Sequence, residues 1–173
     1  ANVIVQRNDS SAENGEIDRQ GGILDVNTNG ILDITNMRIT NVSPGGVTVN
    51  GTLRTSNTGG LNGLGSAIVD GTLTINNNST IDYYATLNQV ISSAPNYYNI
   101  TFSGAGVKTT QGPISVNDNG LVKITGTTTV VATSNIAAVG GNNTAFTMDG
   151  GRLRLETGGT LPLMGGAYNL TGG

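Results

Sequence analysis

The sequence of 173 residues contains neither cysteine nor histidine. Without cysteine, disulfide bonds cannot stabilise the fold and thiolate-bound metal ions are excluded. Without histidine, the chain lacks the commonest general base and the commonest metal ligand, and no Ser-His-Asp or Cys-His arrangement can be built. These absences exclude several of the most frequent classes of catalytic and metal site.

Charge is also scarce, because charged residues make up 11% of the chain, whereas about a quarter is usual. A nucleic-acid partner or an anionic membrane surface would require clustered Lys and Arg, so we expect neither at a net charge of −3. No apolar run approaches the roughly 18 residues of a membrane-spanning helix, which predicts no membrane insertion. The chain begins at Ala1 without a recognisable signal peptide, so we expect a mature or excised segment of a longer protein.

The abundant residues are Gly, Asn and Thr, with 27 glycines alone. Gly and Asn tolerate the positive φ of tight turns, Thr suits pleated strands, and all three are poor helix formers. Disorder is the alternative for such a composition, but 36% of the residues are hydrophobic and recur in short alternating runs. The composition therefore predicts an all-β protein with many short strands.

A six-residue word recurs along the chain: Asn, Asp or Gly, then Gly, any residue, an aliphatic residue, any residue and usually another aliphatic. Its first clear copy is Asn29-Gly30-Ile31-Leu32-Asp33-Ile34. Further copies begin at Asn50, Asp70, Asn119 and Gly150, and a partial copy begins at Gly21. Asn-Gly turns the chain, and the alternation that follows places Leu32 and Ile34 on one side of a strand and Asp33 on the other.

The spacing of these words predicts a repeating coil. Their glycines are Gly30, Gly51, Gly71, Gly120 and Gly151, so the first two steps are nearly equal and the later two are longer. A coil of about 20 residues with variable loops explains this series and predicts a right-handed parallel β-helix, or β-solenoid. An antiparallel β-sandwich is the alternative, because Asn-Gly is also a hairpin signal.

Such a coil predicts two columns of side chains. The inward aliphatic column contains Leu32, Leu53, Leu73, Val122 and Leu153. The outward polar column contains Asp33, Arg54, Thr74, Lys123 and Arg154. Because neighbouring parallel strands are ~4.8 Å apart, we expect Asp33 and Arg54 to form an exposed pair worth under ~1 kcal/mol.

A longer repeat of about 70 residues lies over the coils and is clearest at residues 95–168. It contains Tyr97-Tyr98-Asn99-Ile100-Thr101, then Val107-Lys108-Thr109 and Ile114-Ser115-Val116-Asn117, and Tyr168-Asn169-Leu170-Thr171 opens another unit. Residues 95–125 resemble the repeats of large secreted surface proteins of Bacteroidota, including gliding-type adhesins and other cargo of type IX secretion. The Asp118-Asn119 insertion and residues 1–20 depart from that pattern.

The resemblance implies an extracellular, cell-surface protein with an adhesive or structural role and no chemistry. Together with the repeats, it makes residues 1–173 a single β-solenoid segment of a longer repetitive chain. Its expected partners are neighbouring repeats or identical subunits in a fibre, with surface glycans as a further option. Two alternatives stay open, namely a carbohydrate-active β-helix enzyme and a glycan-binding module without catalysis.

Candidate chemical groups are few. Asp25 and Asp33 occupy equivalent places in consecutive words, and glycoside hydrolysis needs two carboxylates, but we expect both to face solvent. The loop Gly59–Gly65 and the acidic group Asp9, Glu13, Glu16 and Asp18 lack the spacing of calcium sites. One member of each pair, Tyr83–Tyr84 and Tyr97–Tyr98, should be buried and the other outside. We therefore predict no enzyme and no catalytic, cofactor-binding or metal-binding residue.

Overall fold

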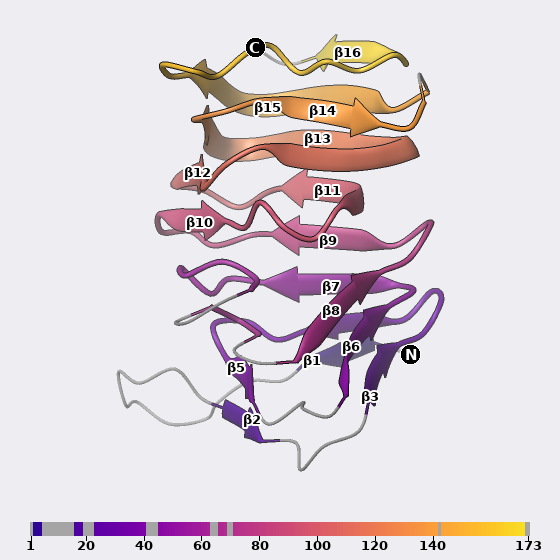
Figure 1. Cartoon of the computed structure of the whole chain (residues 1–173). Coiled ribbons are helices and arrows are strands. Elements are labelled where there is room, and N and C mark those ends of the chain that lie inside the picture. Colours follow the sequence, from indigo (N-terminus) through magenta and orange to yellow (C-terminus); the bar gives the residue numbers. More distant parts are fainter. Residues whose placement is uncertain are drawn as a thin grey trace.

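The computed structural model describes residues 2–4, 16–18, 23–40, 45–62, 66–68, 71–141 and 143–171. Their secondary structure is entirely β, and the strands stack into a solenoid of about six turns (Figure 1). Every described strand pair is parallel, which confirms the predicted β-solenoid and excludes the antiparallel sandwich. Among these residues, no helix is long and apolar enough to cross a membrane.

Most strands are short because turns containing glycine separate them. β13 and β15 are longer because their strand pairing continues around a corner of the coil. In chain order they are β1 (Asn2–Ile4), β2 (Glu16–Asp18), β3 (Ile23–Val26), β4 (Ile31–Asp33), β5 (Arg38–Thr40), β6 (Gly46–Val49), β7 (Thr52–Thr55), β8 (Thr72–Ile75), β9 (Thr80–Tyr83), β10 (Gln89–Ile91), β11 (Tyr97–Phe102), β12 (Val107–Thr110), β13 (Ile114–Ala132), β14 (Ile136–Val139), β15 (Ala145–Leu155) and β16 (Tyr168–Thr171).

The strands form three faces of the solenoid. Face A contains β1, β4, β7, β9, residues 99–102 of β11, residues 121–126 of β13, residues 145–150 of β15, and β16. Tyr97 of β11 lies beside Val116 of face C. Face B contains β2, β5, β10, β12, residues 129–132 of β13 and residues 152–155 of β15, with residues 58–62 and 66–68 between β5 and β10. Face C contains β3, β6, β8, residues 114–117 of β13, β14 and the bridge residue Leu163.

The coil is about 22 residues long, slightly longer than the predicted 20. Its length varies along face A, as the register pairs Ile31↔Thr52, Thr52↔Thr80, Thr80↔Asn99, Asn99↔Leu121, Leu121↔Ala145 and Phe146↔Tyr168 show. The coil between Thr52 and Thr80 is the longest of these. Three coils span nearly one unit of the longer repeat. Tyr168 nevertheless stacks in the column of Ile100 and not in that of Tyr98.

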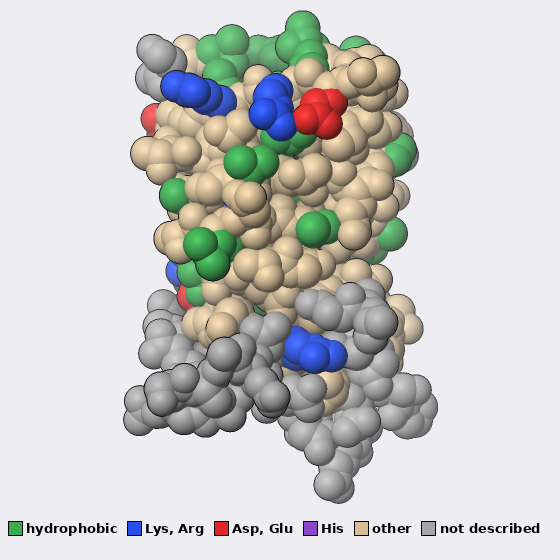
Figure 2. All heavy atoms as spheres, turned by 90° about the vertical axis from the view of Figure 1, so that its left-hand side faces the viewer, with side chains coloured by type: hydrophobic (Ala, Val, Ile, Leu, Met, Phe, Trp, Pro, Cys, Tyr) green, Lys and Arg blue, Asp and Glu red, His purple; other side chains and the backbone are tan. Residues whose placement is uncertain are grey.

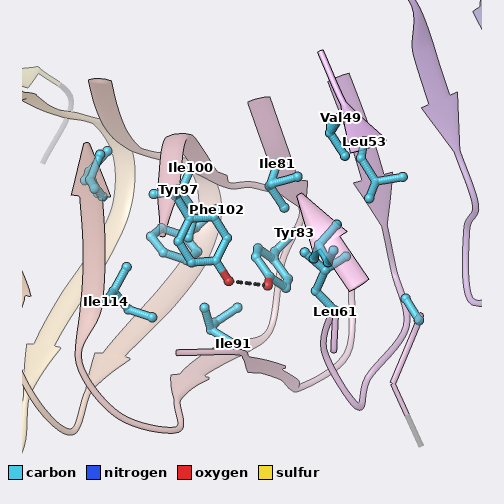
Figure 3. Packing of buried hydrophobic residues seen from close by; sticks show 14 of the residues in the cluster. Val49, Leu53, Leu61, Ile81, Tyr83, Ile91, Tyr97, Ile100, Phe102 and Ile114 are labelled. Atoms are coloured by element: carbon cyan, nitrogen blue, oxygen red, sulfur yellow. Dashed lines mark hydrogen bonds between the residues drawn. The ribbon is translucent and has the colours of Figure 1, made fainter. Parts of the chain in front are cut away.

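The interior is a continuous apolar core, built because alternate residues of every strand point inward. The face A column runs through Leu32, Leu53, Ile81, Ile100, Val122 and Phe146, all of which are buried. Figure 3 shows its middle part, with Ile81 and Ile100 pointing toward side chains from the other faces. Burial of apolar surface between coils is the main source of stability in such a repeat protein.

Two residues of the predicted inward column belong to other faces. Leu73 pairs with Val47 on face C, and Leu153 pairs with Val130 on face B. Thr74 and Arg154, predicted in the outward column with Asp33, follow them to those faces. The prediction was wrong because the Gly-containing word marks any sharp corner of the coil, and the step from Gly51 to Gly71 leads to a different corner.

A column of polar side chains lines the inner side of the corner between faces A and B. Asn57 donates hydrogen bonds to the carbonyls of Asn36 and Met37, Gln89 to those of Thr55 and Asn57, Lys108 to those of Ala85 and Ala105, and Thr128 to those of Ala105 and Gly106. Each side chain thus adds hydrogen bonds to carbonyls at the turning backbone, and those of Thr55, Asn57, Ala85 and Gly106 also accept a backbone amide. Burying these polar side chains without such partners would be costly inside a protein.

Lys108 is the unusual member of this column, because its side chain is fully buried. Burial lowers the pKa of Lys108 to about 8, and the charge of Asp82 opposes that shift only in part. Sequence reasoning did not single it out. Its signal is the alternation in Val107-Lys108-Thr109-Thr110, which places Lys108 and Thr110 at inward positions of β12.

Candidate functional site

The strongest group of charges lies on the outer side of face A and forms what we call the outer cluster: Asp33, Arg54, Asp82, Tyr84 and Ser103. Arg54 Nε lies 2.9 Å from Asp82 Oδ2, and Arg54 Nη1 lies 3.3 Å from Asp33 Oδ2. Asp33 and Arg54 are register partners on adjacent coils, as predicted. The cluster therefore links three consecutive coils through one guanidinium group.

Two further side chains complete the outer cluster. The Tyr84 hydroxyl donates to Asp33 Oδ1 at 2.7 Å, and the Arg54 guanidinium lies over the Tyr84 ring, 4.5 Å from its centroid. The Ser103 hydroxyl donates to Asp82 Oδ1 at 2.6 Å. Both carboxylates thus accept hydrogen bonds from within the cluster, which holds them in fixed orientations.

The exposure predicted for Asp33 and Arg54 was wrong in one respect. Asp33 is 6% exposed although it belongs to the outer side, because Arg54 and Tyr84 from later coils cover it. Burial lowers the pKa of Arg54, but its hydrogen bond to Asp82 and the charges of both carboxylates raise it overall. Burial and the hydrogen bond to Asp33 raise the pKa of Tyr84 to about 12. Asp33 and Arg54 consequently form a covered ion pair. Its removal should lower the free energy of unfolding by more than the removal of an exposed surface pair.

Asp25 does not join Asp33. It lies exposed on β3 of face C, whereas Asp33 belongs to β4 of face A, so their places are not equivalent. Asp25 Oδ1 accepts a hydrogen bond of 2.8 Å from Asn50 Nδ2, and Asn50 Oδ1 accepts one of 2.7 Å from Asn76 Nδ2. Asp25 therefore begins a polar ladder along one corner, and the carboxylate pair considered from sequence is not assembled.

The other acidic and glycine-rich candidates fall partly outside the described residues. Asp9, Glu13 and the loop residues 63–65 lie outside them, while Glu16 and Asp18 contribute the backbone of β2. Among the residues that the structure describes, no group of three or more acidic side chains is placed to hold a metal ion.

The tyrosines divide as expected into buried and outer members. Tyr83 and Tyr97 are fully buried, and Tyr84 and Tyr98 are half-buried. The two buried hydroxyls lie 2.8 Å apart, and Tyr97 also donates to the carbonyl of Ser92 at 2.6 Å (Figure 3). Burial raises the pKa of Tyr83 to about 12 and that of Tyr97 well above its ordinary value. Both rings therefore pack in the hydrophobic core.

A hollow of about 380 Å³ lies near the outer cluster, at the corner between faces A and B. Uncharged residues line it: Asn36, Ser56, Thr58, Ala85, Thr86 and Leu87. Leu87 is 69% exposed. Hydroxyl and amide groups beside an apolar side chain could contact a sugar, but the charged side chains of the outer cluster do not line this hollow.

The C-terminal end of the solenoid exposes several large apolar side chains. A hollow of about 500 Å³ opens there. We call the following lining residues the end face: Phe146, Leu155, Leu161, Leu163, Tyr168 and Leu170. Figure 2 shows hydrophobic side chains gathered at this end, above a wall in which charged side chains are sparse.

The structure thus offers two features for function: an internally paired outer cluster and an open, apolar end face. The first braces neighbouring coils, and the second presents core side chains to the surroundings. No protein-family model, curated protein or solved structure matches this chain.

Proposed function

We propose that this chain is a structural or adhesive segment of an extracellular surface filament or large adhesin, and that it performs no catalysis. The observation that carries the proposal is the continuous stack of parallel coils around one apolar core. A stack of coils extends along one axis and offers a long wall for contacts, which suits a filament shaft or an adhesive surface.

The outer cluster supports the same proposal. Its carboxylates are engaged by Arg54, Tyr84 and Ser103, which suits bracing between coils better than proton transfer in a cleft. The resemblance to repeat-rich surface proteins of Bacteroidota agrees with a location outside the cell. Adhesion would then use the polar, weakly charged walls of the solenoid.

Glycan binding without catalysis is a second candidate, and the hollow at the corner between faces A and B favours it. Asn36, Ser56 and Thr58 supply amide and hydroxyl groups there, and Leu87 supplies an exposed apolar surface. Titration of the purified protein with surface polysaccharides, by calorimetry, tests this candidate. Binding that is lost in Leu87→Asp would support it.

Labelling of intact cells tests the main proposal. Antibodies raised against the purified chain should label the outside of unpermeabilised cells, and brief protease treatment should remove the label. Label that is seen only after permeabilisation would contradict an extracellular role. Incubation of the purified chain with polysaccharides should release no products, and measurable cleavage would contradict the proposal that it performs no catalysis.

A further inference from the structure

Face C is interrupted in the middle of the solenoid. β3, β6 and β8 form a separate three-stranded sheet that ends at β8, whereas residues 114–117 and β14 belong to the large sheet. Residues 93–96 lie between these two groups, because they follow β10 of face B and precede Tyr97, which pairs with Val116. In Figure 1, β3, β6 and β8 run obliquely, whereas β14 lies nearly across the solenoid. We call the boundary between β8 and residues 93–96 the seam.

The edge of β8 that faces the seam has no strand partner among the described strands. On the opposite edge, Thr72 donates its backbone hydrogen bond to the carbonyl of Gly45, beside β6. Because successive backbone amides of a strand point to opposite edges, those of Leu73 and Ile75 point toward the seam. Between β8 and residues 93–96, which the structure describes in full, no strand pair or hydrogen bond crosses the seam.

The inward side chains of β8 are less buried than their counterparts in nearby coils. Leu73 is 8% exposed and Ile75 is half-buried, although both lie well inside the stack. Val47 and Val49 of the preceding coil and Val116 beyond the seam are each 0% exposed. The difference shows that the coil above β8 covers it only in part.

Two features of the sequence explain the seam. Pro95 lacks a backbone N–H, so residues 93–96 are poorly suited to pair with β8. In addition, face B holds two segments of one coil between β5 and β10, namely residues 60–62 and 66–68. Faces A and C each hold one strand at this level, β7 and β8. Face B is therefore taller here than face A by about one strand spacing, ~4.8 Å.

The same two coils are firmly joined on the other faces. On face A, β7 pairs with β9 along its whole length, and Arg54 bonds to Asp82 at 2.9 Å. On face B, the Ser92 hydroxyl accepts hydrogen bonds of 3.1 Å from the amides of Leu61 and Asn62. Bonds thus hold the junction at faces A and B, while face C has only side-chain packing.

We propose that the seam is a bending point of the solenoid, where the coils up to β8 rotate against the coils from β9 onward about the corner between faces A and B. Opening the seam breaks no backbone hydrogen bond on face C, whereas bending between β13 and β14 would disrupt a parallel strand pair. In a stack of coils each interface contributes separately to stability, so the weakest interface moves first. This inference concerns the shape of the shaft and holds whatever surface the protein occupies.

Two pairs of spin labels test the inference. The chain has no cysteine of its own, so each label goes only to a substituted position. Thr48→Cys with Ala137→Cys spans the seam on the outer side of face C. The matched control, Thr52→Cys with Ala145→Cys, spans the same junction on face A, where strand pairing is unbroken. All four residues are half-buried and point outward.

Double electron–electron resonance should give a clearly wider distance distribution for the face C pair than for the face A pair, with unchanged circular dichroism in both labelled proteins. Equally narrow distributions would overturn the inference, because the seam would then be rigid. Equally wide distributions would also overturn it, because the bending would not be confined to the seam.

Hydrogen exchange of the unmodified chain provides a second arm that needs no substitution. The amides of Leu73 and Ile75 should exchange much faster than those of Val47 and Val49, which lie between two paired strands. Equal protection of the two sets would show that the edge of β8 is closed and would overturn the inference.

Discussion

The buried tyrosine pair should respond very differently to removal of one or the other hydroxyl group. Tyr97 donates its single hydroxyl proton to the carbonyl of Ser92, so the 2.8 Å contact requires Tyr83 to donate to Tyr97. Tyr97→Phe removes the donor to Ser92 and the acceptor of Tyr83. Tyr83→Phe removes a bond that Tyr97 accepts, and Tyr97 keeps its bond to Ser92.

The expected magnitudes follow from the cost of leaving buried polar groups without partners. Tyr97→Phe should lower the free energy of unfolding by about 1–3 kcal/mol, whereas Tyr83→Phe should cost less than about 1 kcal/mol. For a chain of this size, a loss of about 2 kcal/mol lowers the melting temperature by roughly 4–8 °C. The two substitutions each remove one hydroxyl group of the same buried contact, so each serves as the control for the other.

Urea denaturation followed by far-UV circular dichroism measures both variants against the unmodified chain. A cost for Tyr83→Phe that equals or exceeds that of Tyr97→Phe would refute the assigned direction of these hydrogen bonds. Near-neutral effects for both would show that the hydroxyl groups contribute little to the core.

Two further predictions concern buried charge. Because the pKa of Lys108 is lowered to about 8 and an unfolded lysine titrates near ~10.4, folding releases a proton between these values and stability rises with pH. Unfolding at pH 8 and pH 9.5 should show a gain of about 1–2 kcal/mol at the higher pH that Lys108→Met abolishes; a pH-independent midpoint would contradict the assignment. Arg54→Met leaves Asp33 and Asp82 without their shared cation and should cost about 1–3 kcal/mol in thermal unfolding. The exposed pair of Arg154 with Glu156 supplies the control, since Arg154→Met should cost under ~1 kcal/mol, and equal costs would mean that burial of Asp33 contributes nothing.

The fold was predictable from the sequence because turns and the inward–outward alternation of strands depend on residues that are close together in the chain. Asn29 and Asn119 precede the glycines of two turn words, and both adopt positive φ of 60° and 61°. The alternation around Leu32 and Leu53 placed these residues inward in one column, as the structure confirms. Leu73 was assigned to the wrong face because the same six-residue pattern occurs at more than one corner and does not indicate which face follows it.

The outer cluster was only partly predictable. Asp33 and Arg54 could be paired from the coil spacing. Tyr84 is 51 residues from Asp33 in sequence and reaches it from a later coil of face A. The step from Thr52 to Thr80 departs from the predicted spacing of about 20 residues, so the sequence did not place Tyr84 beside Asp33 and the burial of Asp33 could not be foreseen. Lys108 was missed for a related reason, since its carbonyl partner Ala85 belongs to the preceding coil.

Electron microscopy of the native material tests the central claim most directly. Protein sheared from the surface of intact cells should contain unbranched filaments of uniform width, labelled along their length by antibodies against this chain. Diffraction from aligned filaments should show a repeat of ~4.8 Å along the filament axis, the spacing of stacked parallel strands. Labelled particles that are compact globules, without elongated shape or axial repeat, would contradict the account.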